Sequence, residues 1–192
     1  MTETKAELRS RARETRKRLK AALPNAGRDL VAGLDPLLAS LAAPPRTAAL
    51  YLPLGSEIDT TPLADELARR GLTLALPRVE APDTPMTFRA WKPGDPVEPD
   101  LQGCSAPLHA AATVEPDLVF LPLVAFDGAG GRLGQGGGYY DRTLAALAGK
   151  RPVVIGLAFA GQQVDRVPCD PHDQKLDGIL TERGYMPARK GS

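Results

Sequence analysis

Seven glycines fall within residues 128–138, and this cluster constrains the fold more than any other feature of the chain. An apolar run, 117–126, precedes it, and a helix-like run, 139–148, follows it. Ordering glycine costs more backbone entropy than ordering any other residue, so an ordered loop of this kind indicates that bare N–H groups approach a ligand. A strand, a glycine loop and a helix start together form an anion site. We therefore expect phosphate there; the alternative is a flexible surface connection.

The composition describes an ordinary globular protein. With 192 residues, 43% of them hydrophobic, the chain is expected to form one domain with its own core. A formal net charge of +1 gives no strong field for nucleic acid or a membrane surface. Cys104 and Cys169 have neither metal-ligand spacing nor a disulfide pattern. Because no apolar run has the length of a membrane span or a signal sequence, we expect a cytoplasmic protein that does not bind a membrane. We also expect a monomer, and the near-neutral charge does not favour nucleic acid as a partner.

Helices and apolar strands alternate along the chain. The predicted helices are 3–22, a stretch from the Pro24-Asn25 break to about residue 42, 61–70 and 139–148; the predicted strands are 47–53, 72–79, 86–91, 118–126, 152–159 and 176–181. This alternation is typical of an α/β fold with a mostly parallel sheet flanked by helices. We expect N-terminal helices over 1–42, an α/β core over 47–186 and a ragged tail over 187–192.

Two local signals refine these boundaries. Thr61 and Pro62 predict a helix start, with a hydroxyl cap and proline at the first position. Pro122 interrupts the run 118–126, as at an edge or the end of a strand. Since parallel sheets bind ligands at the carboxyl ends of their strands, the turns after Pro53, Phe126 and Phe159 are expected to meet there.

Three side chains are the candidates for chemistry. Asp141, in the first turn of the helix after the glycines, could hold Mg²⁺ on a phosphate, or merely complement the helix dipole. Arg132 could neutralise charge in phosphoryl transfer, or be a solvated loop arginine. Glu57 follows the first strand, although an isolated Glu in a turn is most often plain surface. The loop matches neither the P-loop nor the dinucleotide fingerprint, and no hydrolase triad is evident.

The first helix carries a basic stripe. It consists of Lys5, Arg9, Arg13, Arg16 and Lys20. Such a stripe is either a solvated face or a surface that meets an anion. Without interleaved aromatic residues or a basic chain as a whole, nucleic acid is not favoured as that anion.

Several segments resemble one family in order along nearly the whole chain. They are Lys5 to Arg9, Tyr51 to Thr60, Leu74 to Pro77, Met86 to Trp91 with Pro93-Gly94, Pro122 to Asp127, Arg132 to Arg142, His172-Asp173 and Leu176 to Glu182. The segment Arg-Leu-Gly-x-Gly-x-Gly-Tyr-Tyr-Asp is highly specific, whereas Lys-x-x-x-Arg alone is weak. The chain resembles the 5-formyltetrahydrofolate cyclo-ligases, also called methenyltetrahydrofolate synthetases.

The resemblance implies a fold related to sugar-phosphate isomerases and CoA transferases. It also implies ATP- and Mg²⁺-dependent conversion of 5-formyltetrahydrofolate, in polyglutamylated form, to 5,10-methenyltetrahydrofolate, with ADP and phosphate released. The ATP site would comprise Lys5, Arg9, Arg132, Leu133, Gly134, Gln135, Gly136, Gly137, Gly138, Tyr139 and Tyr140. The folate site would comprise Arg9, Leu52, Glu57, Gln135, Gly136, Gly137, Gly138 and Tyr139. Arg132, Tyr139 and Glu57 would act in catalysis, and Asp141 and Asp177 would hold magnesium.

Two positions depart from the family pattern. Gln135 stands where many members carry a basic residue, which leaves fewer positive charges on the phosphates. Cys169-Asp170 stands before Pro171-His172, where an acidic residue near the histidine is more usual, and we assign no role there.

The implied chemistry agrees with the residues. Phosphorylation of the formyl oxygen would make its carbon open to attack by folate N10, after which phosphate leaves. This reaction needs positioning and charge neutralisation rather than a covalent nucleophile.

Two rival functions remain open. An isomerase-like or transferase-like enzyme would use Glu57 as its base or nucleophile and would be indifferent to ATP. A module that binds RNA or nucleotides without turnover would show salt-sensitive binding.

Overall fold

The computed structural model describes residues 4–189. Their helices are α1 (Lys5–Ala22), α2 (Ala26–Asp29), η1 (Leu30–Gly33), α3 (Leu34–Ser40), α4 (Thr61–Arg69), α5 (Tyr139–Ala146) and η2 (Ala160–Gln162). The strands are β1 (Thr47–Ala49), β2 (Thr73–Arg78), β3 (Thr87–Ala90), β4 (Val97–Pro99), β5 (Ser105–Pro107), β6 (Leu118–Pro122), β7 (Ala125–Phe126), β8 (Arg132–Leu133), β9 (Val153–Leu157), β10 (Gly178–Thr181) and β11 (Gly184–Pro187).

A seven-stranded sheet forms the centre, in the order β11-β10-β9-β6-β1-β2-β3. The strands from β10 to β2 pair in parallel, and β3 and β11 pair antiparallel at the two edges. The expected α/β fold with a mostly parallel sheet is therefore confirmed. From β1 the chain proceeds to β2 on one side, and β6, β9 and β10 follow on the other side. The crevice between the carboxyl ends of β1 and β6 is the point at which such sheets bind ligands.

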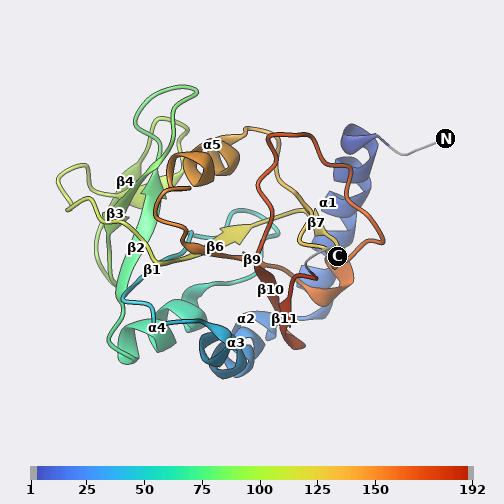
Figure 1. Cartoon of the computed structure of the whole chain (residues 1–192), viewed down its shortest axis with the longest axis horizontal. Coiled ribbons are helices and arrows are strands. Elements are labelled where there is room, and N and C mark those ends of the chain that lie inside the picture. Colours follow the sequence, from blue (N-terminus) through green and yellow to red (C-terminus); the bar gives the residue numbers. More distant parts are fainter. Residues whose placement is uncertain (1–3, 190–192) are drawn as a thin grey trace.

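Helices cover both faces of the sheet. Figure 1 shows α2, α3 and α4 on one side and α5 on the other. Leu118 and Phe120 of β6 pack in a core cluster with leucines of η1, α3 and α4, whereas Val119 and Leu121 pack in a second cluster with Leu144 of α5. Because successive side chains of a strand point to opposite faces, a strand buried on both faces is apolar throughout, as the sequence of β6 is.

The helix starts have different causes. Thr4 and Glu7 form a capping box at α1, in which Thr4 Oγ1 accepts the N–H of Glu7 and the Glu7 carboxylate accepts the N–H of Thr4. The predicted hydroxyl cap at Thr61 is wrong, because Thr60 is the N-cap and its side chain makes no capping bond. Thr60 Oγ1 instead donates to the carbonyl of Tyr51 at 2.8 Å and ties α4 to the end of β1.

Pro122 is the last residue of β6, so the expected strand end is confirmed, although β6 is an interior strand and not an edge strand. Other boundaries differ from the prediction. The proline-rich segment after β3 contains the hairpin β4–β5, which the sequence did not indicate. The tail expected from residue 187 is preceded by the edge strand β11, and residues 190–192 lie outside the described part of the chain, as does residue 3 at the predicted start of the first helix. Within residues 4–189, no helix has the length and hydrophobicity that crossing a membrane requires.

Candidate active site

A cavity of about 550 Å³ opens at the carboxyl ends of the parallel strands. Tyr51 and Leu52, after β1, and Pro122, at the end of β6, line it, so it occupies the crevice that the strand order predicts. Its size lies in the usual range of ligand pockets. Of the side chains expected at the site, Asp177 alone does not line this cavity. Those that do are Lys5, Arg9, Leu52, Glu57, Arg132, Leu133, Gly134, Gln135, Gly136, Gly137, Gly138, Tyr139, Tyr140 and Asp141.

The glycine-rich segment divides into two parts. Its first three glycines lie in the turn of the hairpin β7–β8, where the Asp127 carboxylate accepts the backbone N–H groups of Ala129 and Gly131. Only the second part, residues 134–138, lines the cavity. Gly138 is the N-cap of α5 and adopts a φ of 68°, a conformation that favours glycine. The loop therefore delivers bare backbone to the cavity directly before the positive end of a helix, as the sequence predicts for an anion site.

Helix α1 closes the other side of this loop. Arg9 Nε donates to the carbonyl of Gly134 at 3.1 Å. Arg13 Nε donates to Gln135 Oε1, and Arg13 Nη2 donates to the Gln135 carbonyl, each at 3.1 Å. Arg13 thus places a positive charge beside Gln135, the position at which many family members carry a basic residue, although Arg13 itself does not line the cavity. In the sequence, the basic stripe indicated that the first helix could contact an anion, but it did not show which of its members contacts the glycine loop.

Arg132 and Asp141 form a partly buried ion pair. Arg132 Nη2 donates to Asp141 Oδ1 at 2.5 Å, and the exposed fractions of the two side chains are 5% and 27%. The backbone N–H of Gln174 donates to the same Asp141 oxygen at 3.0 Å. Arg132 Nε is buried and has no hydrogen-bond partner among the described residues. A buried guanidinium with an unused donor on a cavity wall can bind an anionic ligand.

Glu57 lies buried in the turn after β1. Its Oε2 accepts the N–H of Leu54 at 2.9 Å, and its Oε1 lies 3.7 Å from Arg16 Nη1. Burial raises the pKa of Glu57, while the Leu54 N–H and the Arg16 charge oppose that rise. Arg16 also donates to Ser56 Oγ at 3.0 Å and to the Leu123 carbonyl at 3.1 Å. Arg16 thereby joins the turns that follow β1 and β6.

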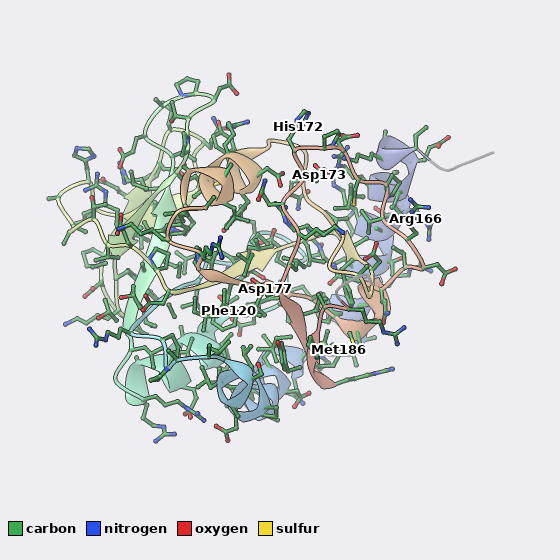
Figure 2. All side chains as sticks on the ribbon, in the orientation of Figure 1. Phe120, Arg166, His172, Asp173, Asp177 and Met186 are labelled. Atoms are coloured by element: carbon green, nitrogen blue, oxygen red, sulfur yellow. The ribbon has the colours of Figure 1, made fainter. Side chains whose placement is uncertain are left out.

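Lys5 is held by two carboxylates at the cavity entrance. Its Nζ lies 2.7 Å from Asp170 Oδ2 and 2.5 Å from Asp173 Oδ2. Burial opposes the charge on Lys5, but these hydrogen bonds outweigh it and raise the pKa of Lys5. Figure 2 shows Asp173 and His172 in the loop that faces the start of α1. Asp170 and Asp173 line the cavity, and the sequence had assigned a role to neither.

The expected magnesium ligands have different surroundings. Asp141 lies on the cavity wall. Asp177 is exposed, directly precedes β10, and accepts the N–H of Val154 at 2.9 Å; Figure 2 draws it well apart from Asp173. Within residues 4–189, no group of three or more His, Cys, Asp or Glu side chains is arranged to hold a metal ion. Mg²⁺, however, is usually bound by one or two carboxylates together with substrate phosphates, and Asp141 fits that arrangement. The part of Asp177 in metal binding stays a prediction.

Known proteins with a similar sequence or fold share one description. The profile of the 5-formyltetrahydrofolate cyclo-ligase family matches residues 1–182. The 5-formyltetrahydrofolate cyclo-ligase of Haemophilus influenzae is 37% identical over 147 residues, which are 69% of this chain and 73% of that protein. The protein of the same description from Mycolicibacterium smegmatis is 34% identical over 152 residues, 75% of this chain and 78% of that protein.

Two solved structures share the fold. The 5,10-methenyltetrahydrofolate synthetase of Aquifex aeolicus superposes with a TM-score of 0.78 at 29% identity, and the match covers 98% of this chain and 94% of that one. A 5,10-methenyltetrahydrofolate synthetase from Mycoplasma pneumoniae gives a TM-score of 0.70 at 26% identity, covering 94% of this chain and 99% of that one.

Proposed function

Because the chain belongs to the 5-formyltetrahydrofolate cyclo-ligase family, it catalyses the cyclisation of 5-formyltetrahydrofolate to 5,10-methenyltetrahydrofolate, and we propose that it does so in the cavity at the carboxyl edge of the sheet. The co-substrate in this proposal is ATP. One observation carries it: the basic glycine loop and the turn that holds Glu57 are walls of the same cavity. A phosphate donor bound at the loop and a folate bound against the turn would therefore lie side by side.

The triphosphate would bind at residues 134–138. The backbone N–H groups of this loop and the start of α5 provide the anion site, and Arg9 and Arg13 add positive charge from α1. Lys5 would exchange its bonds to Asp170 and Asp173 for phosphate oxygens. Asp141, on the cavity wall, would hold Mg²⁺, and the ion would offset the negative charge of the phosphates.

The reaction is a phosphoryl transfer followed by a ring closure. The formyl oxygen takes the γ-phosphoryl group and ADP leaves; folate N10 then attacks the activated carbon, loses its proton, and inorganic phosphate departs. Arg132 would neutralise the charge on the transferring group, since its Nε is buried and unused and its Nη2 is fixed by Asp141. The γ-phosphorus and the formyl oxygen must come within about 3–3.5 Å of each other for this step. Glu57 and Tyr139 would orient the folate.

Direct detection of the product tests the proposal. We expect the methenyl chromophore to appear when the protein is mixed with 5-formyltetrahydrofolate, ATP and Mg²⁺, and not when ATP is omitted. Binding of both ligands without a chromophore would mean that the site binds the substrates but does not catalyse the reaction between them. A sugar-phosphate isomerase-like or CoA-transferase-like activity at Glu57, the rival that keeps a related fold, would proceed equally well without ATP.

Asp141→Asn separates the metal role from substrate binding. Asparagine retains an oxygen for Arg132 and for the N–H of Gln174 but loses the charge that binds Mg²⁺. We expect kcat to fall by about 10²-fold, as when a single charge-stabilising group is removed, while the Kd for folate changes little. Glu115→Gln, on a surface carboxylate that pairs with Lys150, is the matched control. Equal losses in kcat and in folate affinity would argue against the metal role.

A further inference from the structure

The hydroxyl of Tyr51 is a buried donor that has no partner within residues 4–189. The side chain of Tyr51 is 4% exposed and lines the cavity, and its Oη has no hydrogen-bond partner among the described residues. Leaving such a group unpaired in the folded protein costs free energy, so it indicates a ligand atom that completes the bond. Nothing in the reaction described above uses this hydroxyl.

The position of Tyr51 is fixed from two directions. Thr60 Oγ1 donates to its backbone carbonyl at 2.8 Å, and its ring belongs to the core cluster that also contains Phe159. Burial, and next the charge of Glu57, raise the pKa of Tyr51 far above its usual value. The hydroxyl therefore stays protonated at physiological pH and acts as a donor that cannot easily move away from the cavity.

Glu57, on the same turn, provides unused acceptors. One of its oxygens accepts the Leu54 N–H, the other lies 3.7 Å from Arg16, beyond hydrogen-bond range, and the Gln135 side chain also donates to the carboxylate. Since a carboxylate can accept about four hydrogen bonds, Glu57 can still accept from a ligand. The lining of the cavity thus presents, on one turn, an acceptor that can take two N–H groups and a single fixed donor.

This arrangement matches one edge of the substrate. On the pyrimidinone ring of a reduced folate, the 2-amino group and N3–H are adjacent donors, and the 4-oxo group next to them is an acceptor. The benzoylglutamate end is anionic and would be repelled by Glu57, so this end of the cavity suits the ring. We propose that Tyr51 is a specificity residue, which donates a hydrogen bond to the 4-oxo group while Glu57 accepts from N3–H and the 2-amino group. This inference rests on the proposed function.

Tyr51→Phe removes only the hydroxyl and leaves the ring in the core. We expect the Kd for 5-formyltetrahydrofolate to rise by about 2- to 12-fold, which is the usual effect of losing one neutral hydrogen bond. The Kd for ATP should not change. Tyr185→Phe, on β11 and outside the cavity, is the matched control and should alter neither Kd.

A ligand change identifies the atom that Tyr51 contacts. The 4-amino analogue of 5-formyltetrahydrofolate places a donor where the natural ligand has the 4-oxo acceptor, and its N3 carries no hydrogen for Glu57, so the wild-type protein should bind it more weakly than the natural ligand. In Tyr51→Phe the ratio of the two Kd values should shrink by about tenfold, because the contribution of Tyr51 is lost while that of Glu57 is common to both proteins.

Three results would overturn the inference. They are unchanged affinities in Tyr51→Phe, an equal loss of affinity for both ligands, or a fall in kcat with no change in Kd, which would place the hydroxyl at the reacting atoms instead. These binding measurements are separable from the proposed function. If the wild-type protein binds folate and gives the methenyl chromophore while Tyr51→Phe behaves as wild type, the inference about Tyr51 alone fails.

Discussion

Replacing Arg16 by methionine would leave the Glu57 carboxylate buried without its counter-charge. The exposed fractions of the Arg16 and Glu57 side chains are 6% and 5%. Removing one partner of such a pair costs about 3–5 kcal/mol, because the remaining charge is desolvated and uncompensated. The Leu123 carbonyl keeps a partner in Gln162 Nε2, so the loss falls mainly on Glu57 and Ser56. For a chain of this length we expect Tm to fall by roughly 6–20 °C.

The size of this effect should depend on pH. Burial raises the pKa of Glu57 above its ordinary value of 4.5, and removing Arg16 takes away one of the influences that oppose the rise. Well below pH 4.5 the carboxyl group is protonated in both the folded and the unfolded states, so the penalty disappears. The penalty grows as the pH rises above 4.5 and is fully present above the pKa of the folded state. Arg16→Met should therefore lose more stability at pH 8 than at pH 5.

Urea titrations at the two pH values measure this directly. Lys17→Met is the matched control, since Lys17 lies on the same helix and pairs with Glu14 at the surface, with both side chains more than half exposed. We expect this control to cost at most about 1 kcal/mol. The double variant Arg16→Met/Glu57→Gln should recover much of the stability. Equal costs for Arg16→Met and Lys17→Met, or no recovery in the double variant, would refute the reasoning.

Two further changes test the glycine segment and the cavity entrance. A Cβ at Gly131 would lie 2.5 Å from Asp127 Oδ2, whereas a Cβ at Gly128 would meet only Gln163 Nε2, at 4.0 Å. In urea titrations we therefore expect Gly131→Ala to lower the free energy of unfolding by about 1–3 kcal/mol and Gly128→Ala to lower it by less than about 0.5 kcal/mol. Similar losses in the two variants would contradict this. If Lys5 exchanges its carboxylates for phosphates, Lys5→Gln should raise the KM for ATP by about tenfold, as the loss of one charge-assisted bond would, and leave the Kd for folate unchanged. A rise in both constants would show that Lys5 acts on the cavity as a whole.

The sequence predicted the sheet well where burial sets the pattern. The run 118–126 was expected as one buried strand; its first part is β6, which is apolar because it is buried on both faces, and its end is β7 of the separate hairpin β7–β8. The hairpin β4–β5 was missed, because its strands are three residues long and contain prolines, so no alternation is visible. The glycine cluster was treated as one loop because glycine content cannot separate a hairpin turn from a ligand loop. The Asp127 carboxylate accepts hydrogen bonds within the hairpin turn, and these bonds set the turn apart from the loop that lines the cavity.

The site was predicted best where several residues of one short segment contribute. Residues 132–141 all line the cavity, and Glu57 reaches it from the turn after β1, as expected. Arg16 and Tyr51 were missed for a physical reason. A basic stripe does not show which of its members is buried, and Arg16 is 5% exposed because it bridges two turns that are distant in the sequence. An unsatisfied hydroxyl such as that of Tyr51 becomes visible only when its neighbours are known.

The first half of helix α1 packs in a small hydrophobic cluster of its own. Leu8 and Ala12 contact Val124, Ala125, Leu133 and Val167 there, apart from the two clusters on the sheet faces, and only Leu19, in the second half of the helix, packs against the larger of those two clusters. A segment held in this way can open locally at a lower cost than global unfolding. Because Arg9 and Arg16 would leave with it, heating should abolish turnover before the sheet melts. Bound nucleotide should bring the temperature at which turnover is lost closer to the temperature at which the sheet melts, because a ligand that binds only the closed form stabilises that form by mass action.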